Sequence, residues 1–317
     1  MRFGIDAMGG DNAPCAVVEG AIEAQEALQA DDTIVLIGDQ QQITRHLNQY
    51  NSSKEKIEIV HASEIIAMDD QPTRAFSSKT DSSINIGFKM LKKGELDSFA
   101  SAGNTGVMLV GSFYEIGVIQ GILRPTTTAL IPRENGKNTI LLDVGTNPDV
   151  KPDVLNQFAV LGALYAEFFI GVENPKIGLL NIGTEAKKGN ILVQSTFPLL
   201  LENKEINFIG NIEGRDVFSD KADVIVCDGF TGNIVLKQLE AFHEIMARNH
   251  ADDPFTKRMD FENFGATPVI GINKPVLIAH GVSGAKAFKN MIINSKKLIK
   301  TNLKDKIQQK LAKSIVL

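Results

Sequence analysis

Tryptophan is absent from this sequence of 317 residues, which contains only two cysteines and five histidines. Cys15 and Cys227 are too few for a disulfide framework, and this scarcity predicts a reducing cytoplasm as the compartment. His280 has no histidine, cysteine or carboxylate near it at the spacing of metal ligands. The sequence therefore predicts no disulfide scaffold and no metal site, and we expect no cofactor.

An excess of positive charge is also lacking, since 33 lysines and arginines face 38 aspartates and glutamates, for a net charge of -5. This balance argues against nucleic acid as a partner, because binding to phosphate backbones depends on clustered cations. Long hydrophobic runs are missing too. The most apolar stretch, residues 158–172, is short and contains Glu167, so it predicts a buried helix and not a membrane span. Met1 and Arg2 lead directly into a predicted strand, and we expect no signal peptide.

What the sequence does have is a regular alternation of short apolar runs and helical periodicity, which predicts a parallel α/β sheet. The length fits one large domain or two closely joined ones. Strands are predicted at residues 3–5, 33–37, 57–60, 98–101, 139–142, 176–182, 206–209, 224–227 and 275–279. Helices are predicted at residues 17–28, 40–49, 105–119, 152–170 and 233–248, with another beginning at residue 191. Long connections are predicted at residues 67–83 and 251–265, and a basic helix at about 284–314.

Five of the predicted strands end in turns that contain both glycine and asparagine. These turns are residues 6–12, 101–106, 143–147, 183–190 and 228–233. In an open parallel sheet, ligands bind outside the carboxyl ends of the strands, near the point where the strand order reverses. The repetition therefore predicts that the five turns surround a single crevice.

The turn after residue 182 is the strongest candidate for an anion site. Residues 176–182 form a buried apolar run, and Gly183, Lys187, Lys188 and Gly189 follow before the next helix. Backbone N–H groups and a helix N-terminus supply partial positive charge there, and lysine supplies a full one. An ordinary turn with solvated lysines remains the alternative.

Seven segments together resemble the acyl-acyl carrier protein:phosphate acyltransferases of bacterial phospholipid synthesis, the PlsX-type family. The segments are Asp6-Ala-Met-Gly-Gly-Asp-Asn-Ala-Pro14, Ser101-Ala-Gly-Asn-Thr-Gly106, Gly178-Leu-Leu-Asn-Ile-Gly-Thr-Glu185, Lys187-Lys-Gly-Asn190, Asn207-Phe-Ile-Gly-Asn-Ile-Glu213, Asp228-Gly-Phe-Thr-Gly-Asn233 and His280-Gly281. They occur in the family's order over nearly the whole chain, which is far more specific than a single glycine motif.

The resemblance implies a three-layer α/β/α sandwich with a mostly parallel sheet, related to isopropylmalate dehydrogenase and phosphotransacetylase. It implies one phosphate acyltransferase domain over residues 1–317, with a helical protrusion at about 233–262. The implied reaction transfers a long acyl chain from acyl carrier protein to inorganic phosphate and gives acyl phosphate for phosphatidic acid. The implied partners are a second copy of the chain, a weak peripheral membrane contact, and a membrane glycerol-3-phosphate acyltransferase that receives the product. The connector after Glu240 is shorter than in many relatives, which bears on the membrane contact.

By this resemblance, direct attack of bound phosphate on the thioester is expected, with Lys188, Asn104 and Asp228 as catalytic residues. The substrate-binding residues implied are Asp6, Gly9, Gly10, Asn12, Gly103, Thr105, Gly106, Asp143, Asn147, Thr184, Glu185, Lys187, Asn190, Gly229, Thr231, Gly232, Asn233 and His280. Turn or cap chemistry is the alternative for the asparagines and aspartates, and a structural histidine for His280. Cys227 is interpreted as a core residue, with an acyl-enzyme nucleophile as the other option.

Three other functions stay open. A nicotinamide dehydrogenase is disfavoured because no Gly-x-Gly-x-x-Gly motif follows any predicted strand. An acetyl-coenzyme A phosphotransacetylase would use similar chemistry, and an inactive membrane-docking protein could keep the fold. The closing helix is either a basic surface for acyl carrier protein or lipid, or an ordinary packed helix. Its lysines are Lys296, Lys297, Lys300, Lys304, Lys306, Lys310 and Lys313.

Overall fold

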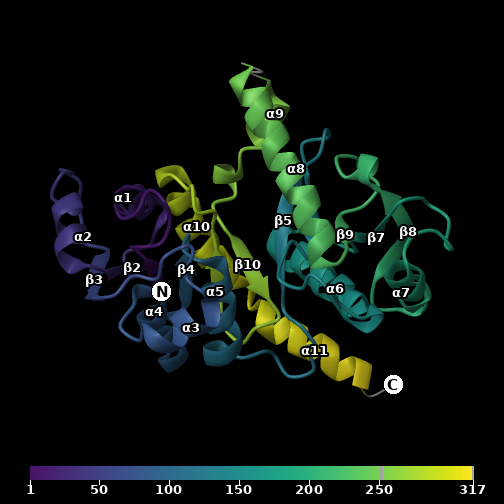
Figure 1. The fold of residues 1–317 in the computed structure, drawn as a ribbon, viewed down its shortest axis with the longest axis horizontal. Coiled ribbons are helices and arrows are strands. Elements are labelled where there is room, and N and C mark those ends of the chain that lie inside the picture. The colour runs from purple at the N-terminus through teal and green to yellow at the C-terminus, as the bar shows by residue number, and fades with distance from the viewer. Residues whose placement is uncertain (250–252, 316–317) are drawn as a thin grey trace. The chain divides into compact units, whose positions relative to one another are not determined.

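A computed structural model describes residues 1–249 and 253–315 of the chain. These residues form two compact units (Figure 1). The first unit consists of Met1–Val118 and Phe261–Asn302, and the second of Ile119–Asp260 and Leu303–Leu317. Each unit is therefore built from segments far apart in the sequence. The interpretation of residues 1–317 as a single functional domain stays a prediction.

The first unit contains a mostly parallel sheet. Its strands are β1 (Arg2–Asp6), β2 (Thr33–Gly38), β3 (Ile57–His61), β4 (Ser98–Ser101), β10 (Thr267–Ile270) and β11 (Val276–Ile278). They lie in the order β3-β2-β1-β4-β11-β10, and only the β10–β11 pair is antiparallel. The strand order reverses between β1 and β4, and this is the position where an open α/β sheet binds its ligands.

Helices cover both faces of this sheet. They are α1 (Cys15–Ala24), α2 (Gln40–Leu47), α3 (Pro72–Ser78), α4 (Ser83–Lys93), α5 (Thr105–Gly111) and α10 (Ala285–Thr301). Val35 and Ile37 of β2 pack with residues of α4 and α5 in one buried cluster. Ile34 and Leu36 alternate with them along the strand and therefore face the opposite side. On α1, Gly20 allows a close approach to α10, because a Cβ at this position would lie 2.6 Å from Phe288 Cβ.

The second unit contains another mostly parallel sheet. Its strands are β5 (Thr126–Pro132), β6 (Asn138–Leu142), β7 (Lys176–Asn181), β8 (Asn207–Glu213) and β9 (Val224–Val226). They lie in the order β5-β6-β9-β7-β8, and β5 alone runs antiparallel to its neighbour. β6, β9 and β7 are adjacent and parallel, so the turns that follow them lie at one edge of the sheet.

The second unit is also layered, with helices on both faces of its sheet. Its helices are α6 (Pro152–Tyr165), α7 (Ile191–Glu202), α8 (Gly229–Arg248), α9 (Pro254–Arg258) and α11 (Leu303–Ile315). On one face, α6 packs closely enough that a Cβ on Gly162 would lie 2.6 Å from Val224 Cγ1. On the other face, Val235 and Leu239 of α8 pack against buried residues of the sheet. Each unit therefore has three layers, in agreement with the α/β/α layering that the resemblance implies.

α6 continues into a short helical segment, Ala166–Ile170. Together they form the one helix among the described residues, Pro152–Ile170, that is long and apolar enough to cross a membrane. Of its most apolar window, 56% is buried within the structure. Leu155 and Phe158 are fully buried there. The packing of this helix against the sheet accounts for its apolar composition, as the sequence interpretation of residues 158–172 expects.

Several predicted element boundaries are wrong. Residues 67–83 are not one loop, because α3 begins at Pro72, where the Gln71 side chain accepts a hydrogen bond from the Arg74 N–H. The helix predicted at 233–248 begins four residues earlier, at Gly229. Strands β5 and β10 were not predicted at all; both are antiparallel to their neighbours, and β5 begins with three threonines.

The closing basic helix is also corrected, because it is two helices. Asn302 has a φ of 49°, a left-handed conformation that asparagine tolerates, and it separates α10 from α11. Lys296 pairs with the buried Asp32 at 2.7 Å, and Lys306 lies 5.0 Å from the centre of the Phe168 ring. At least part of the lysine set thus packs within its own unit. The side chain of Lys313 lies outside the described residues.

Candidate functional site

In the first unit, the point of strand reversal is closed by a pair of buried polar side chains. Asp6 ends β1 and Ser101 ends β4. The Ser101 hydroxyl donates to Asp6 Oδ2 at 2.6 Å and accepts from the Gly103 N–H at 2.8 Å. Burial raises the pKa of the Asp6 carboxyl, and the hydrogen bond from Ser101 partly opposes this rise. The pair fixes the two turns to each other.

Glycine is required where these turns meet. A Cβ on Gly9 would lie 2.3 Å from Asp6 Oδ2 and 2.7 Å from the Gly103 nitrogen. Both distances are too short for a Cβ contact, so a side chain at this position would clash. Gly10 has a φ of 103°, which a residue with a side chain rarely adopts. Close packing beside Asp6 therefore explains Gly9, and backbone conformation explains Gly10.

The turn after β11 joins the same cluster. The Asp11 N–H donates to the Gly281 carbonyl at 2.7 Å. The Asn12 amide donates to the Val282 and Ser283 carbonyls at 3.1 and 3.2 Å. His280, which precedes this turn, places its ring 4.7 Å from the ring of Phe261. The structure thus brings Asp6, Asn12 and His280 to one group of turns, and their roles toward substrate stay predictions.

The side-chain amide of Asn104 is hydrogen-bonded at both its oxygen and its nitrogen. Its Oδ1 accepts from the Val107 N–H at 3.1 Å and so caps α5. Its Nδ2 lies 3.2, 3.0 and 3.0 Å from the carbonyl oxygens of Ala67, Met68 and Asp70. A primary amide has two hydrogens, and both are engaged by this loop. A direct contact with substrate would require these bonds to break.

Two further predicted site residues begin the helix that Asn104 caps. Thr105 is exposed, and Gly106 is partly buried against α3. A Cβ on Gly106 would lie 2.5 Å from Pro72 Cγ. Gly106 therefore serves the packing of α5 against α3, while nothing in these contacts assigns a role to Thr105.

In the second unit, Asp143 organises the turn after β6. Its carboxylate accepts from the Asn147 N–H at 2.6 Å, the Asn147 amide at 2.8 Å and the Thr146 N–H at 3.1 Å. Asp143 and Asn147 are buried. The Gly229 N–H then donates to the Asn147 carbonyl at 2.8 Å, which links this turn to the start of α8.

Asp228 is the N-cap of α8. It accepts from the Thr231 N–H and the Thr231 hydroxyl, both at 2.8 Å. A Cβ on Gly232 would lie 1.9 Å from the Asp143 carbonyl oxygen, so this helix turn touches the neighbouring turn directly. Asn233 also faces that turn, with its Oδ1 3.4 Å from where a Cβ on Gly145 would lie. The turns at 143–147 and 228–233 therefore form one cluster, as predicted.

Cys227 lies beneath this cluster. It is buried, and burial together with the charges of Asp228 and Asp143 raises the pKa of its thiol well above the ordinary value. A thiol that resists ionisation is a poor nucleophile. These surroundings favour the interpretation of Cys227 as a core residue.

The turn at 183–190 is clasped at both ends and exposed in the middle. The Asn181 amide donates to the Lys188 carbonyl at 3.1 Å, and the Asn211 amide to the Glu185 carbonyl at 2.9 Å. Asn190 caps α7 by accepting from the Val193 N–H at 2.9 Å. The exposed residues of the turn are Thr184, Glu185, Ala186, Lys187, Lys188 and the capping Asn190. A fixed backbone thus presents two lysines to solvent.

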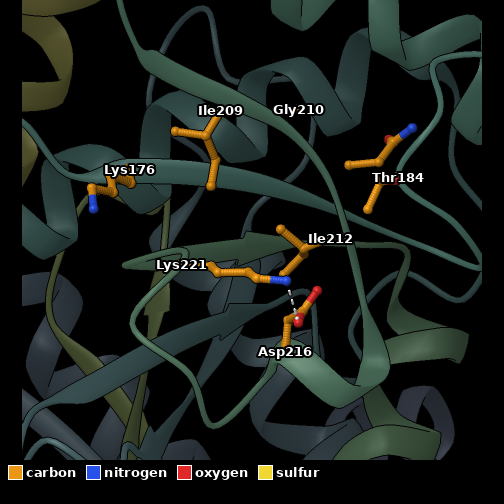
Figure 2. Close-up of a pocket in the computed structure, with 8 residues that line it drawn as sticks. Lys176, Thr184, Ile209, Gly210, Ile212, Asp216 and Lys221 are labelled. Carbon is orange, nitrogen blue, oxygen red and sulfur yellow. Dashed lines mark hydrogen bonds and ion pairs between the residues drawn. The ribbon is translucent and has the colours of Figure 1, made fainter.

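A cavity of about 460 Å³ lies beside this turn (Figure 2). Thr184 and residues of β8 line the cavity. Lys176 and Lys221 also line it, and sequence reasoning identified neither as a site residue. Lys221 points toward Asp216, and their ion pair at 2.6 Å offsets much of its charge. Lys176 is the other cation of the lining. No sequence signal linked these residues, because they come from separate elements.

Sequence reasoning also missed a set of exposed apolar side chains in the turns at the carboxyl ends of the strands. They are Ile65, Met68 and Val282 in the first unit and Ile182, Ile191 and Phe230 in the second. Ile182 and Ile191 flank the Lys188 turn and are 80% and 85% exposed. Exposed apolar side chains of this kind can contact an apolar ligand when they lie together. Only burial values reveal them, since the same residues would be unremarkable in a core.

No group of three or more histidine, cysteine, aspartate or glutamate side chains in the described residues could hold a metal ion. The cluster in the first unit and the two in the second each follow the carboxyl ends of parallel strands. The hypothesis that all five turns surround one crevice joins residues of both units, and it stays a prediction.

The chain is similar to known proteins over nearly its whole length. The family model described as "Fatty acid synthesis protein" matches residues 1–306. The phosphate acyltransferase of Halothermothrix orenii is 39% identical, with 99% of each chain covered. The phosphate acyltransferase of Brevibacillus brevis is 41% identical, with 99% of this chain and 98% of the relative covered.

Solved structures show the same fold at low sequence identity. The EutD phosphotransacetylase from Staphylococcus aureus has a TM-score of 0.63 at 15% identity, with 94% of each chain covered. A branched-chain phosphotransacylase from Enterococcus faecalis has a TM-score of 0.64 at 14% identity, with 94% of this chain and 99% of that chain covered. These likenesses confirm the predicted phosphotransacetylase-like α/β fold.

Proposed function

The chain belongs to the phosphate acyltransferase family, and from this premise we propose that it transfers a long acyl chain from acyl carrier protein to inorganic phosphate. The product is an acyl phosphate for phospholipid synthesis. Membership in the family makes the protein an enzyme of acyl transfer that involves phosphate. The observation that carries the finer proposal is the exposed Lys188 turn, because two exposed isoleucines flank its cation. A cation beside apolar side chains suits an anion and an acyl chain together.

In the proposed reaction, a phosphate oxygen attacks the carbonyl carbon of the thioester. The new C–O bond forms as the carbonyl electron pair moves to oxygen, and the C–S bond then breaks as that pair returns. The thiolate leaves and takes a proton from water. Phosphate is largely ionised near neutral pH and thiolate is a good leaving group, so the reaction needs little help from a general acid or base. The protein must mainly hold phosphate in line and offset its charge.

Lys188 is the proposed contact to phosphate or to the developing oxyanion. A compact ammonium at the exit of a strand can approach either group. Asp143 and Asp228 bind backbone N–H groups, and these contacts support a role in shaping the turns. Asn104 caps α5 and Asp228 caps α8, and both remain predicted catalytic residues.

The test supplies the purified protein with phosphate and one of three donors: palmitoyl-acyl carrier protein, palmitoyl-coenzyme A or acetyl-coenzyme A. Acyl phosphate is trapped with hydroxylamine as the hydroxamate. We expect product with the carrier protein donor, at a rate at least about tenfold above that with acetyl-coenzyme A. A preference for acetyl-coenzyme A would instead identify a phosphotransacetylase, and no product from any thioester would overturn the proposal.

We also propose that the protein acts as a homodimer with a weak membrane contact and passes its product to a membrane glycerol-3-phosphate acyltransferase. The support for association comes from α8, which is drawn in Figure 1. Gly229 and Gly232 are its only buried residues. Large apolar side chains of this helix, among them Phe242 and Ile245, are exposed. An exposed apolar helix face of this kind favours association.

A further inference from the structure

The loop between β3 and α3 in the first unit is held by polar contacts yet exposes apolar side chains. Ile65 and Met68 of this loop are 47% and 49% exposed. Lys79 donates to the Ile65 carbonyl and forms an ion pair with Asp70. Asp70 in turn accepts from the Ala67 N–H at 2.8 Å. The loop has no α-helix or strand of its own, so these contacts define its conformation.

Asn104 supplies the largest share of this support. Its amide donates to three carbonyls of the loop, and its Oδ1 caps α5 at the same time. Asn104 is buried and both hydrogens of its amide are engaged. One side chain therefore ties the loop that carries Met68 to the helix that follows β4.

Met68 lies against the turn after β11. A Cβ on Gly281 would lie 3.1 Å from Met68 Cε, so the methyl group of Met68 rests beside the Gly281 backbone. The next residue, Val282, is 59% exposed, and its carbonyl is held by the Asn12 amide. Met68 and Val282 thus form an apolar rim beside the turn that contains Gly10.

This rim has a cost unless an apolar group covers it. Burial of exposed apolar surface is favourable by about 25 cal/mol per Å². Polar contacts fix the backbone of this loop, so an added apolar group is what would cover its side chains. Phosphate gains nothing from methyl and thioether groups. The acyl group is the apolar part of the family's reaction, and methionine adapts well to a flexible chain.

We propose that Met68 and Val282 contact the acyl chain of the thioester substrate and set its preferred length, and that Asn104 is a positioning residue that holds Met68 in place. The inference rests on the proposed function, and it assigns Asn104 a role through the loop and not through the reacting atoms. If this is so, the effect of an Asn104 or Met68 substitution on kcat/KM depends on the length of the acyl chain. An Asn104 amide that contacted the reacting carbonyl group would affect all chain lengths equally.

The test measures kcat/KM with butanoyl, dodecanoyl and hexadecanoyl groups on acyl carrier protein. For Met68→Ala, we expect the ratio of the long-chain to the butanoyl value to fall about tenfold, because lost apolar contact grows with chain length. Met68→Leu keeps the apolar volume and should restore most of the ratio. Tyr114→Ala is the control. Tyr114 is an exposed residue of the same unit, and it lies in the short helical segment Ser112–Ile116 that follows α5.

Asn104→Asp separates positioning from direct catalysis. The carboxylate keeps the cap on α5 but cannot donate to the three carbonyls, so the loop should be released. We expect the same selective loss with long chains as for Met68→Ala, and little further loss when both changes are combined. Thermal unfolding of each variant checks that the fold is retained.

An equal loss with all three donors would overturn the inference, as would an unchanged ratio in a folded Met68→Ala variant. For Asn104→Asp, an equal loss with all donors would place Asn104 at the reacting atoms. These results differ from a failure of the proposed function, in which the unaltered protein makes no acyl phosphate with any donor.

Discussion

At the scale of single residues, three aspartates show how carboxylates shape the turns that follow parallel strands. Asp6, Asp143 and Asp228 each accept hydrogen bonds from backbone N–H groups of the turn that follows them. Each carboxylate therefore directs its charge to backbone donors. A free carboxylate would repel phosphate, whereas the charge of these carboxylates is engaged within their own turns.

Lysine is the residue that distinguishes an anion site from a set of well-packed turns. For Lys188→Ala, we expect turnover to fall well over tenfold with unchanged folding, because the phosphate charge loses its proposed counterion. Lys137→Ala is the matched control: Lys137 is also exposed, but it precedes β6 at the opposite edge of the same sheet. Steady-state rates and thermal unfolding are compared for both. Near-normal activity of Lys188→Ala would remove this lysine from the mechanism.

The sequence predicts residue roles best where chemistry is local. Asx caps and glycine turns depend on a few neighbours, so the cap or turn alternatives for Asp228 and Asn190 could be anticipated. The cap that Asn104 forms on α5 belongs to the same alternative, but its contacts with the 67–70 loop could not be anticipated, because its amide bonds to residues 34 to 37 positions away in the chain. The apolar rim of Met68 and Val282 escaped prediction for the same reason, since exposure is a property of the folded chain.

At the scale of elements, the start of α8 is fixed by a close contact with its neighbour. For Gly232→Ala, we expect a loss of about 2 kcal/mol in the free energy of unfolding, because the new methyl group would overlap the Asp143 carbonyl oxygen. Gly214→Ala is the control, since a Cβ there meets no atom within 4 Å. Urea unfolding measures both. Equal stability of the two variants would show that contact between these turns does not constrain the start of α8.

Another contact between elements predicts a dependence of stability on pH. Asp32 precedes β2 and pairs with Lys296 of α10 and with the Met1 amine. Burial raises the pKa of Asp32, but the hydrogen bonds, led by that of Lys296, outweigh burial and lower the pKa below 3.8. A lowered pKa in the folded state adds stability above the unfolded value and loses it as the pH falls through the folded value.

Asp32→Asn should therefore be less stable than the unaltered protein at pH 7, by on the order of 1 kcal/mol. The difference should narrow as the pH falls below about 4, because the unfolded chain then takes up a proton on this carboxyl before the folded protein does. Asp31→Asn, at the exposed neighbouring position, is the control. Urea unfolding across this range is the measurement, and a difference that stays constant with pH would argue against the ion pair.

Element prediction succeeded where burial and periodicity agree and failed where they do not. Most central strands are continuous apolar runs, and the sequence locates them within a residue or two. β5 begins with threonines and ends at Pro132, and α3 is rich in serine, so neither matches a simple apolar pattern. The break at Asn302 interrupts a continuous periodicity of lysines and of isoleucines and leucines, because backbone conformation at one residue can divide a helix.

At the scale of the whole molecule, the sequence predicts the fold class well, since alternation of strands and helices leaves few arrangements. It does not predict the division into two units. The second segments of both units lie after residue 260, and their return depends on contacts over more than a hundred residues. The sequence also does not predict association between copies. The apolar residues of an exposed helix face follow the same spacing as those of a buried face, so the sequence does not distinguish the two.

The proposed dimer is tested at this scale through α8. We expect the unaltered protein to run as a dimer, and Phe242→Glu or Ile245→Glu to raise the dimer dissociation constant about hundredfold, because a charge replaces an apolar contact. Leu123→Glu is the control, since Leu123 is an exposed apolar residue of the same unit outside α8. Light scattering over a concentration series gives the mass, and circular dichroism checks the fold. A monomeric unaltered protein, or a dimer that both α8 variants leave intact, would show that α8 does not join two copies. In the second case the apolar face of α8 would still be available to a membrane, and vesicle sedimentation with the same variants would test that role.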